Sequence, residues 1–379
     1  MYIICHYMSP SLYVLLPGGV LSLDSFIKTA VLVSGGVDSA VALHKLAQSG
    51  RPVTAFYLKI WLEDELVHLG TCPWEEDLQY VRAICDKLGV PLEVISLQKP
   101  YWDQVVAYTI AEVRAGRTPN PDVLCNSRIK FGVFMAAIDP SYARIASGHY
   151  ARAERTDDGV KLCVTPDPIK DQTYFLSQLT PTQLAKLEFP LGSMTKQEVR
   201  AYAHAHDLPN KDRKDSQGIC FLGNFKFRDF IAHHVGIKKG SLIEWETGTK
   251  LGEHDGFWFY TIGQRQGIRL GGGPWYVMQK DTARNIVYIS RTYYAADKMR
   301  DQFLVSQCSW LATPPADGER LKLKMRHGPH YHDALVTHRG DGTLHIQLAM
   351  HDQGIAAGQF AVFYRGDVCV GSGVIALCS

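Results

Sequence analysis

One hexapeptide, Ser34-Gly35-Gly36-Val37-Asp38-Ser39, constrains the fold of this chain more than any other segment. The apolar run 30–33 before it predicts a buried strand, and residues 39–48 after it predict a helix that Gly50 ends. Two glycines allow a sharp turn that brings backbone N–H groups close to an anion, and the helix adds the positive end of its dipole. The segment therefore predicts a phosphate-binding loop.

A simpler alternative is a glycine turn that enters a helix capped by Ser or Asp. The complete order of strand, two glycines, two serines, aspartate and helix favours the phosphate loop. The loop lacks the lysine found in the loops of kinases and GTPases. It resembles instead the S-G-G-x-D-S pyrophosphate loop of the ATP-pyrophosphatase superfamily, whose members cleave ATP to AMP and pyrophosphate and activate a carbonyl oxygen as an adenylate. This resemblance implies the chemistry but not the substrate.

Strands and helices are expected to alternate along the first 150 residues. The expected strands are 30–33, 52–58, 92–97 and 145–147, and the expected helices are 39–48, 75–88 and 102–114. This alternation predicts an α/β fold, with a parallel sheet that binds ligands at the carboxyl ends of its strands. Residues 150–164 predict a hairpin and 195–206 a helix, and from Phe303 onward short alternating strands predict a small β-barrel.

Composition excludes several classes of protein. The 379 residues are 46% hydrophobic and 21% charged with a net charge of +2, which is typical of a globular protein with two or three domains. No run approaches the ~20 apolar residues of a membrane span. The apolar run 12–23 is interrupted by Pro17 and no Lys or Arg precedes it, so a signal peptide is not expected. Nine scattered cysteines without a C-x-x-C pair indicate a reducing cytoplasm and no zinc ribbon.

Two cysteines lie in segments that suggest chemistry. Residues 118–126 read Thr-Pro-Asn-Pro-Asp-Val-Leu-Cys-Asn, which predicts a stiff loop that places Asp122 and Cys125 together, before a helical stretch 129–138. Cys220 follows a charged run, 211–214, that can lower the pKa of a thiol. Considered alone, each cysteine is also consistent with a small buried hydrophobe.

Together with the hexapeptide, these segments resemble the tRNA-specific 2-thiouridylases of the MnmA/TrmU family. The T-P-N-P-D-V-x-C-N and D-S-Q-G-I-C-F motifs are highly specific, and the match runs along nearly the whole chain. Other matching segments are 147–152, 170–176, 189–192, 260–265 and 361–364.

The resemblance implies a three-part chain. Residues 1–225 would form the catalytic domain, 226–298 a central tRNA-binding domain and 299–379 a C-terminal β-barrel domain. Residues 1–25 are expected to be a disordered extension or the product of an upstream start codon, and 187–208 are expected to pack with the central domain.

The resemblance also implies an activity and its residues. ATP would adenylate the C2 oxygen of the wobble uridine, position 34 of tRNA, and AMP and pyrophosphate would be released. Cys220 would carry the persulfide, Cys125 would be the nucleophile and Asp122 the general acid/base. ATP contacts would fall on Leu32, Val33, Ser34, Gly35, Gly36, Val37, Asp38, Ser39, Leu58 and Gly148. Contacts with tRNA would fall on Asn120, Pro121, Asp122, His149, Lys170, Asp171, Gln172, Arg326, His327, Gly358 and Gln359.

Cofactors and partners follow from the same resemblance. We expect ATP with Mg²⁺ and no structural metal. The expected partners are tRNAs for Lys, Glu and Gln and an upstream sulfur donor, such as a cysteine desulfurase or a sulfur-relay protein. The expected protein is a cytoplasmic monomer without membrane association. The stretch 350–357 departs from the family pattern, as does His327.

Other interpretations remain open at this stage. The enzyme could use ammonia or an amine as the nucleophile, or the chain could be a non-catalytic RNA-binding protein. His330 and His332 alternate along an expected strand and could bind a metal, although histidines that face solvent or phosphate are favoured. The glycine run 271–273 is expected to be a turn and not a nucleotide site. Residues 257–260 are expected to be a core strand, with base stacking as the alternative.

Overall fold

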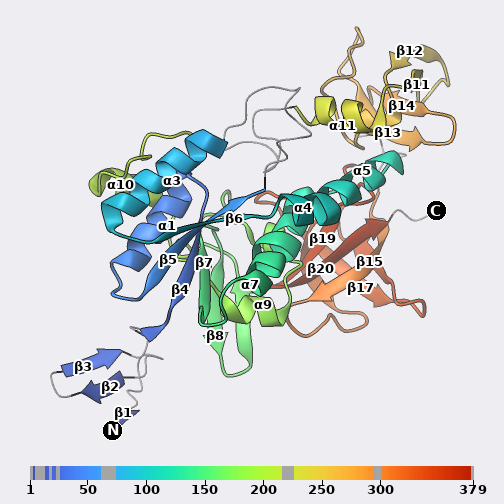
Figure 1. Cartoon of the computed structure of the whole chain (residues 1–379). Coiled ribbons are helices and arrows are strands. Elements are labelled where there is room, and N and C mark those ends of the chain that lie inside the picture. Colours follow the sequence, from blue (N-terminus) through green and yellow to red (C-terminus); the bar gives the residue numbers. More distant parts are fainter. Residues whose placement is uncertain are drawn as a thin grey trace. The chain divides into compact units, whose positions relative to one another are not determined.

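The computed structural model describes residues 3–4, 13–16, 19–22, 26–60, 74–215, 226–293, 295 and 300–376, with side chains from residue 26 onward. The chain divides into two compact units, each described by itself (Figure 1). Unit 1 comprises Met1–Lys99, Ile129–Thr173 and Pro181–Gly223. Unit 2 comprises Pro100–Arg128, Tyr174–Thr180 and Asn224–Ser379.

Unit 1 contains a five-stranded parallel sheet, as the sequence predicted. Its strand order is β10-β7-β4-β5-β6, with every neighbouring pair parallel. The central strand β4 is buried along its whole length, as expected for an apolar strand covered on both faces. The strands are β4 (Thr29–Val33), β5 (Val53–Lys59), β6 (Leu92–Ser96), β7 (Arg144–Ser147) and β10 (Leu187–Glu188).

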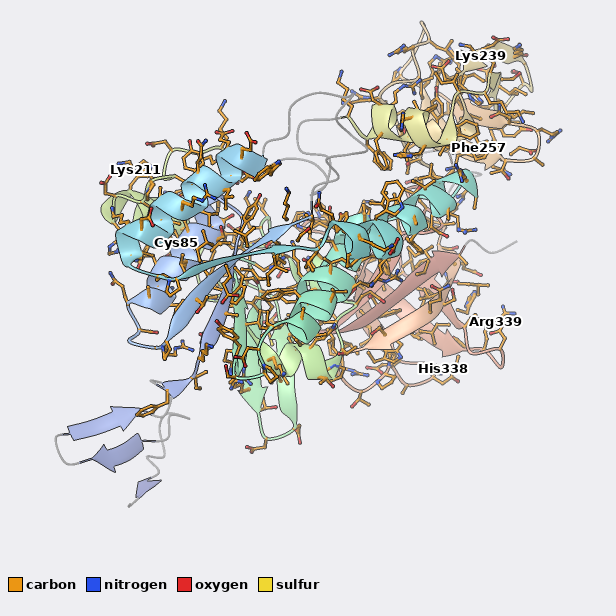
Figure 2. All side chains as sticks on the ribbon, in the orientation of Figure 1. Cys85, Lys211, Lys239, Phe257, His338 and Arg339 are labelled. Atoms are coloured by element: carbon orange, nitrogen blue, oxygen red, sulfur yellow. The ribbon has the colours of Figure 1, made fainter. Side chains whose placement is uncertain are left out.

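Three helices pack in the core of unit 1, and Figure 1 shows them together beside the sheet: α1 (Val37–Ala47), α3 (Trp74–Leu88) and α10 (Lys196–Ala205). On α3 the buried residues repeat at helical spacing, and Cys85 is among them (Figure 2). Helix α10 begins with a capping box between Thr195 and Glu198. Leu191, Val199 and Leu208 belong to the same core as β4. Residues 187–208 therefore pack in unit 1, which differs from the expected packing with the central domain.

The remaining elements of unit 1 are short. The predicted hairpin is present as β8 (Arg152–Thr156) and β9 (Gly159–Cys163), which pair antiparallel. Helices α7 (Phe134–Ala137) and α9 (Pro181–Lys186) complete the unit. In the N-terminal segment, β1 (Ile3–Ile4), β2 (Tyr13–Leu16) and β3 (Gly19–Ser22) form an antiparallel sheet. These ranges have regular backbone, and the disordered extension expected over 1–25 stays a prediction.

In unit 2, a helical segment covers the expected helix 102–114. It consists of α4 (Gln98–Tyr101), η3 (Trp102–Val106) and α5 (Ala107–Arg114). A second one begins in unit 2 with α6 (Pro121–Leu124) and continues as η4 (Cys125–Val133), whose residues from Ile129 onward belong to unit 1. Asp122 and Cys125 therefore lie on a helix, and the prediction of a loop through residue 126 is wrong. Proline at the first helical position has the required φ and lacks only an N–H that would be unpaired there, so Pro121 starts this helix.

A four-stranded sheet with order β12-β11-β14-β13 forms the middle of unit 2. Residues 257–259 form a single 3-10 turn, η5 (Phe257–Phe259), so the expected strand is wrong, although Phe257 and Tyr260 are buried in the core as predicted. Gly256, with φ of 146°, precedes the turn. The elements are α11 (Phe227–Val235), β11 (Gly240–Glu244), β12 (Lys250–His254), β13 (Tyr276–Asp281) and β14 (Ile286–Ser290).

The C-terminal part of unit 2 is the predicted β-barrel. Six antiparallel strands follow the order β15-β18-β17-β16-β19-β20, and β20 pairs with β15 to close the barrel. Closure leaves no open strand edge, and the interior is filled by apolar side chains such as Phe303 and Ile346. The strands are β15 (Gln302–Trp310), β16 (Arg320–Lys324), β17 (His332–His338), β18 (Leu344–Leu348), β19 (Phe360–Arg365) and β20 (Val368–Ala376).

Candidate functional site

The hexapeptide connects the carboxyl end of β4 to the start of α1. Gly35 has φ of 77°, and a Cβ there would lie 2.6 Å from the carbonyl oxygen of Asp77, so this position requires glycine. Ser39 Oγ accepts from the backbone N–H of Ser34 at 3.1 Å and donates to the carbonyl of Gly36 at 2.9 Å. Gly36 is the N-cap of α1 and makes no side-chain cap bond. The first N–H groups of α1 are therefore left for an anion.

The Asp38 carboxylate is held by residues from two other segments of unit 1. Lys196 Nζ lies 2.7 Å and 2.9 Å from its two oxygens, and the Tyr150 hydroxyl donates to Oδ1 at 2.8 Å. Lys196 also pairs with Asp215 at 2.8 Å. Burial raises the pKa of Asp215, but hydrogen bonds from Lys196 and Lys170 outweigh it and lower the pKa to about 2. The loop is thus surrounded by fixed charges of both signs.

Two further side chains hold the loop from outside. Asn210 Nδ2 donates to the carbonyl of Gly35 at 2.8 Å. Arg213 forms an ion pair with Asp77, and a Cβ on Gly35 would lie 2.8 Å from its Nη1, so this guanidinium stands directly beside the loop. Lys196, Tyr150, Asn210 and Arg213 were not predicted as site residues. Their sequence neighbourhoods carry no phosphate motif, and only folding brings them to the loop.

Gly148 follows β7 and lies against the start of α1. A Cβ on Gly148 would be 2.8 Å from the backbone nitrogen of Ser39. Because β7 and β4 are adjacent parallel strands, both segments leave the same edge of the sheet. The chain continues from β4 to β5 on one side while β7 lies on the other, so this is the crevice where α/β sheets bind ligands. The predicted ATP residues Leu32 to Ser39 and Gly148 therefore share one place, and Leu58 lies on the neighbouring strand β5.

The tRNA residues predicted in unit 1 have mainly internal contacts. His149 Nδ1 lies 2.8 Å from Ser147 Oγ, and burial lowers the pKa of His149 to about 3. Asp171 is 2% exposed, and its carboxylate accepts from Thr165 and Thr173. The buried position of Asp171 does not support its predicted contact with tRNA.

Lys170 and Gln172, the two neighbours of Asp171, are less buried than Asp171. Gln172 Oε1 accepts from the backbone N–H of Tyr150 at 2.9 Å, so this side chain fixes the residue whose hydroxyl holds Asp38. Lys170 pairs with Asp215 at 3.1 Å and remains partly exposed. Of this group, Lys170 is the side chain best placed to meet a phosphate.

In unit 2, the helix that carries Asp122 and Cys125 is tied to segments far along the chain. Asp122 is half-buried and Cys125 is fully buried, three residues later on the same helical segment. Asn126 Nδ2 donates to the carbonyl of Phe175 at 3.1 Å. The Phe175 ring stacks on His327 with centroids 4.7 Å apart. Phe175 therefore connects His327 to the helical segment on which Asp122 and Cys125 lie.

Arg326 is held in place by a buried carboxylate. Asp352 is 7% exposed and accepts from both terminal nitrogens of Arg326, at 2.6 Å and 3.2 Å. Burial raises the pKa of Asp352, but the bonds from Arg326 outweigh it and lower the pKa. Arg326 and Asp352 line a cavity of about 530 Å³ together with Gln359. The other residues around this cavity are Thr118, Thr261, Ile262, Gly263, Tyr276, Tyr293, Met325, Gln353, Gly354 and Ala356.

The remaining predictions concern the histidines at 330 and 332, a metal site and Cys220. Lys324, on the strand that precedes these histidines, is 1% exposed, and its ammonium lies 4.3 Å from the Tyr331 ring centroid. His332 lies 3.4 Å from Asp352. Within the described part of the chain, no group of three or more His, Cys, Asp or Glu is placed to hold a metal. Cys220 lies outside the described residues.

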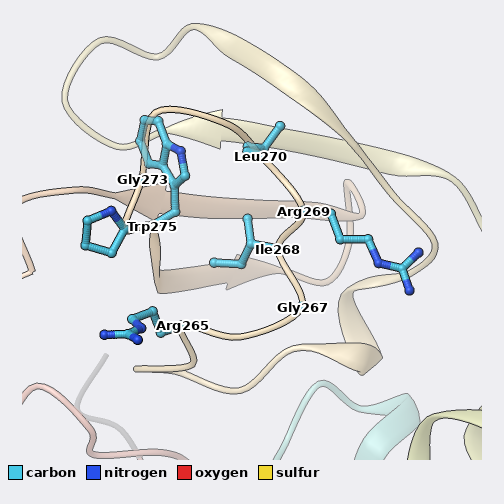
Figure 3. Close-up of a pocket in the computed structure, with 8 residues that line it drawn as sticks. Arg265, Gly267, Ile268, Arg269, Leu270, Gly273 and Trp275 are labelled. Atoms are coloured by element: carbon cyan, nitrogen blue, oxygen red, sulfur yellow. The ribbon is translucent and has the colours of Figure 1, made fainter.

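The glycine run 271–273 forms a turn around Trp275, whose Nε1 donates to the carbonyl of Gly271 at 2.9 Å. Figure 3 shows this turn beside Arg265 and Arg269, which with it line a cavity of about 400 Å³. The glycines lead into strand β13 and not into a helix, so the turn lacks the architecture of a phosphate loop.

Comparisons with known proteins identify the class first. Residues 27–224 match the family model described as the tRNA methyl transferase HUP domain, which supports the use of ATP. Residues 228–291 match the tRNA methyl transferase PRC-barrel domain, and 300–375 match the aminomethyltransferase beta-barrel domain. The chain is therefore an α/β HUP-domain protein that carries a C-terminal barrel.

Curated relatives then identify the family. The tRNA-specific 2-thiouridylase MnmA of Parabacteroides distasonis is 44% identical over 92% of this chain and 99% of its own. That of Porphyromonas gingivalis is 43% identical over 91% and 98%. The chain belongs to the tRNA-specific 2-thiouridylase family, a family of tRNA sulfurtransferases, as the sequence motifs predicted.

Solved structures add little. The NMN synthetase from Francisella tularensis aligns over 51% of this chain and 67% of its own, with 18% identity and a TM-score of 0.31, and this weak likeness carries no functional argument.

The helices were also compared with the length and apolar character of a membrane span. Among the described residues, no helix is both long and apolar enough to span a bilayer.

Proposed function

We propose that this protein catalyses ATP-dependent 2-thiolation of the wobble uridine, position 34, of tRNA. The observation that carries the proposal is the uncapped start of α1 behind the Ser34–Ser39 loop, in a chain that belongs to the 2-thiouridylase family. Backbone N–H groups and a helix dipole are suited to hold the phosphates of ATP. The family membership supplies the acceptor, a tRNA uridine.

ATP would bind at the carboxyl ends of β4 and β7, beside the loop and Gly148. The pyrophosphate portion would lie on the N–H groups at the start of α1, where Lys196 and Arg213 supply positive charge. Leu58 would contact the adenosine portion through its partly exposed apolar side chain, and the proposed contacts of Leu32 and Val33 lie at the end of the buried strand β4. Both oxygens of Asp38, the acidic residue of the loop, already accept from Lys196. We therefore propose that Mg²⁺ enters together with ATP and offsets the negative charge of its phosphates.

The first reaction step is adenylation. The C2 oxygen of the uridine attacks the α-phosphorus of ATP, a new O–P bond forms and pyrophosphate leaves. This step converts a poor leaving group into AMP. Asp122, three residues before Cys125, is the proposed general acid/base, since a carboxylate can accept the uridine N3 proton that is lost as the oxygen attacks.

The second step delivers sulfur from a persulfide on Cys220. Either its terminal sulfur attacks C2 directly and Cys125 then cleaves the S–S bond, or Cys125 first releases hydrosulfide that attacks C2. In both routes AMP leaves from C2, and a disulfide between Cys125 and Cys220 remains. An external thiol must reduce this disulfide, and an upstream donor such as a cysteine desulfurase or sulfur-relay protein must reload Cys220.

The remaining expectations are part of the same proposal. The three segments 1–225, 226–298 and 299–379 would act as the catalytic, central and barrel domains of a cytoplasmic monomer. Asn120, Pro121, Arg326 and His327 would contact the tRNA, whose expected identities are those for Lys, Glu and Gln.

One incubation tests the proposal. Protein, ATP, Mg²⁺, a sulfide source and unmodified tRNA are combined, and the wobble nucleoside is analysed by mass spectrometry. The expected product is 2-thiouridine with stoichiometric AMP. An amidated nucleoside, or unmodified uridine with no AMP, would refute the proposal.

A further inference from the structure

The side-chain amide of Gln359 is committed to the backbone that precedes Asn120, Pro121 and Asp122. Gln359 Nε2 donates to the carbonyl of Thr118 at 2.8 Å, and the carbonyl of Pro119 lies at 3.4 Å. Gln359 is itself fixed in the barrel, because its carbonyl accepts from the N–H of Ile375 on β20 at 2.8 Å. A rigid barrel residue therefore holds a segment located 240 residues earlier in the chain.

The residues before Gln359 approach the same segment closely. The N–H of Thr118 donates to the carbonyl of Ala357 at 2.8 Å. Gly358 has φ of 90°, and a Cβ there would lie 3.0 Å from the backbone nitrogen of Thr118. Only glycine permits both this conformation and this approach. Thr118 is thus held at its N–H and at its carbonyl by one turn of the barrel.

A second attachment lies two residues further along. Tyr174 is fully buried, and its hydroxyl donates to the carbonyl of Phe360 at 3.2 Å and is hydrogen-bonded to the side chain of Asn120. Phe360 directly follows Gln359, at the start of β19. Asn120 is the N-cap of the helix on which Asp122 lies. Gln359 therefore holds one end of the tripeptide Thr118-Pro119-Asn120 directly, and Phe360 holds the other end through the Tyr174 hydroxyl.

From this geometry we infer that Gln359 is a positioning residue: its amide clamps the Thr118–Pro119 backbone and so sets the start of the helix that carries Asp122 and Cys125. Its amide N–H donors are already used inside the protein. The contact with tRNA expected from the sequence stays a prediction. A displacement of the helix start would move both reactive groups relative to the bound uridine, and small misplacements of this kind reduce the rate of the chemical step. The kinetic consequence rests on the proposed function, whereas the clamp itself does not.

The clamp is tested by Gln359→Glu, which keeps the size of the side chain but removes its N–H donors. In the free protein, without tRNA or ATP, hydrogen–deuterium exchange at the Thr118 amide should accelerate roughly five- to tenfold. With saturating tRNA, kcat for thiolation should fall about tenfold or more. Gln359→Met, which removes the donors without adding charge, should produce both effects if the Glu variant does not fold.

The matched control is Gln353→Glu, which places the same charge on a residue that lines the same cavity. Its effect should be confined to tRNA affinity, with Thr118 exchange as in the wild type. Unchanged Thr118 exchange and unchanged kcat in both Gln359 variants, with only KM for tRNA increased, would overturn the inference and make Gln359 a simple RNA contact. The exchange measurement needs no activity, so a failure of the proposed function would be seen separately as absent thiolation in the wild type.

Discussion

Lys196 Nζ lies 2.7 Å and 2.9 Å from the two carboxylate oxygens of Asp38, although 158 residues separate them. Asp38 is the second residue of α1 and Lys196 the first residue of α10. The starts of two helices therefore lie within side-chain reach of each other at the proposed phosphate loop, and the lysine neutralises a carboxylate that would otherwise repel ATP.

Lys196→Ala should lower AMP formation about 10- to 100-fold and raise KM for ATP, because it removes a charged donor and leaves Asp38 negative beside the phosphates. Steady-state AMP release at varied ATP measures this. Lys211→Ala is the control, since the Lys211 ammonium (labelled in Figure 2) pairs with the exposed carboxylate of Asp207 and not with Asp38. Equal losses in both variants would contradict the role of Lys196.

Gly148→Ala should reduce ATP use at least tenfold. The added Cβ would lie 2.8 Å from Ser39 nitrogen, so the start of α1 must shift, with a stability loss of about 1–3 kcal/mol. Gly340→Ala is a matched control, because a Cβ there meets nothing within 4 Å. Isothermal titration calorimetry measures the affinity for ATP, and urea unfolding measures the loss of stability. ATP affinity equal to wild type in the Gly148 variant would count against the crevice as the ATP site.

Cys220→Ala should abolish thiolation yet leave ATP-dependent adenylation of tRNA detectable, because the persulfide acts only in the second step. Cys85→Ala is the control, since Cys85 is a buried thiol whose pKa burial raises to about 11. Labelled AMP on tRNA and mass analysis of the nucleoside separate the two steps. Full thiolation by the Cys220 variant would eliminate the persulfide assignment.

Acid should destabilise the protein through His149. Burial lowers the folded-state pKa of His149 to about 3, below the usual value of 6.5, so only the unfolded state takes up a proton between these values. The free energy of unfolding should therefore fall as pH decreases from 6.5 toward 3, by at most about 1.4 kcal/mol per pH unit from this group. His149→Gln should flatten the pH dependence of urea unfolding above pH 4.5. An unchanged slope would mean that His149 is not buried in its neutral form.

Affinity for tRNA should fall as salt rises, since phosphate contacts release counterions. Arg326→Ala should reduce the slope of log Kd against log salt by about one. Arg339→Ala, at a barrel hairpin, is an equally exposed control (Figure 2). Filter binding between 50 and 300 mM salt, over which the Debye length shortens by a factor of about 2.4, measures this. Tighter binding at high salt would contradict docking through phosphates.

Local patterns were sufficient for much of the fold. Apolar runs at strand length predicted β4, β5 and β7, and helical spacing predicted α3, because burial on one or both faces imposes these periods directly. The errors lie where one residue changes the backbone. Pro121 starts a helix in a segment expected to be a loop, and Gly256 precedes a turn in a segment expected to be a strand.

The Ser34–Ser39 loop, the Asp122–Cys125 spacing and the family could be determined from the sequence alone, since each depends on residues close together in the chain. Tertiary structure decided what surrounds them: Lys196 on Asp38, Asp352 on Arg326 and Gln359 on Thr118. These pairs join segments up to 241 residues apart. No local pattern encodes such pairs, because a hydrogen bond requires two atoms to meet within about 3 Å, and only the packed sheet and barrel bring them to that distance.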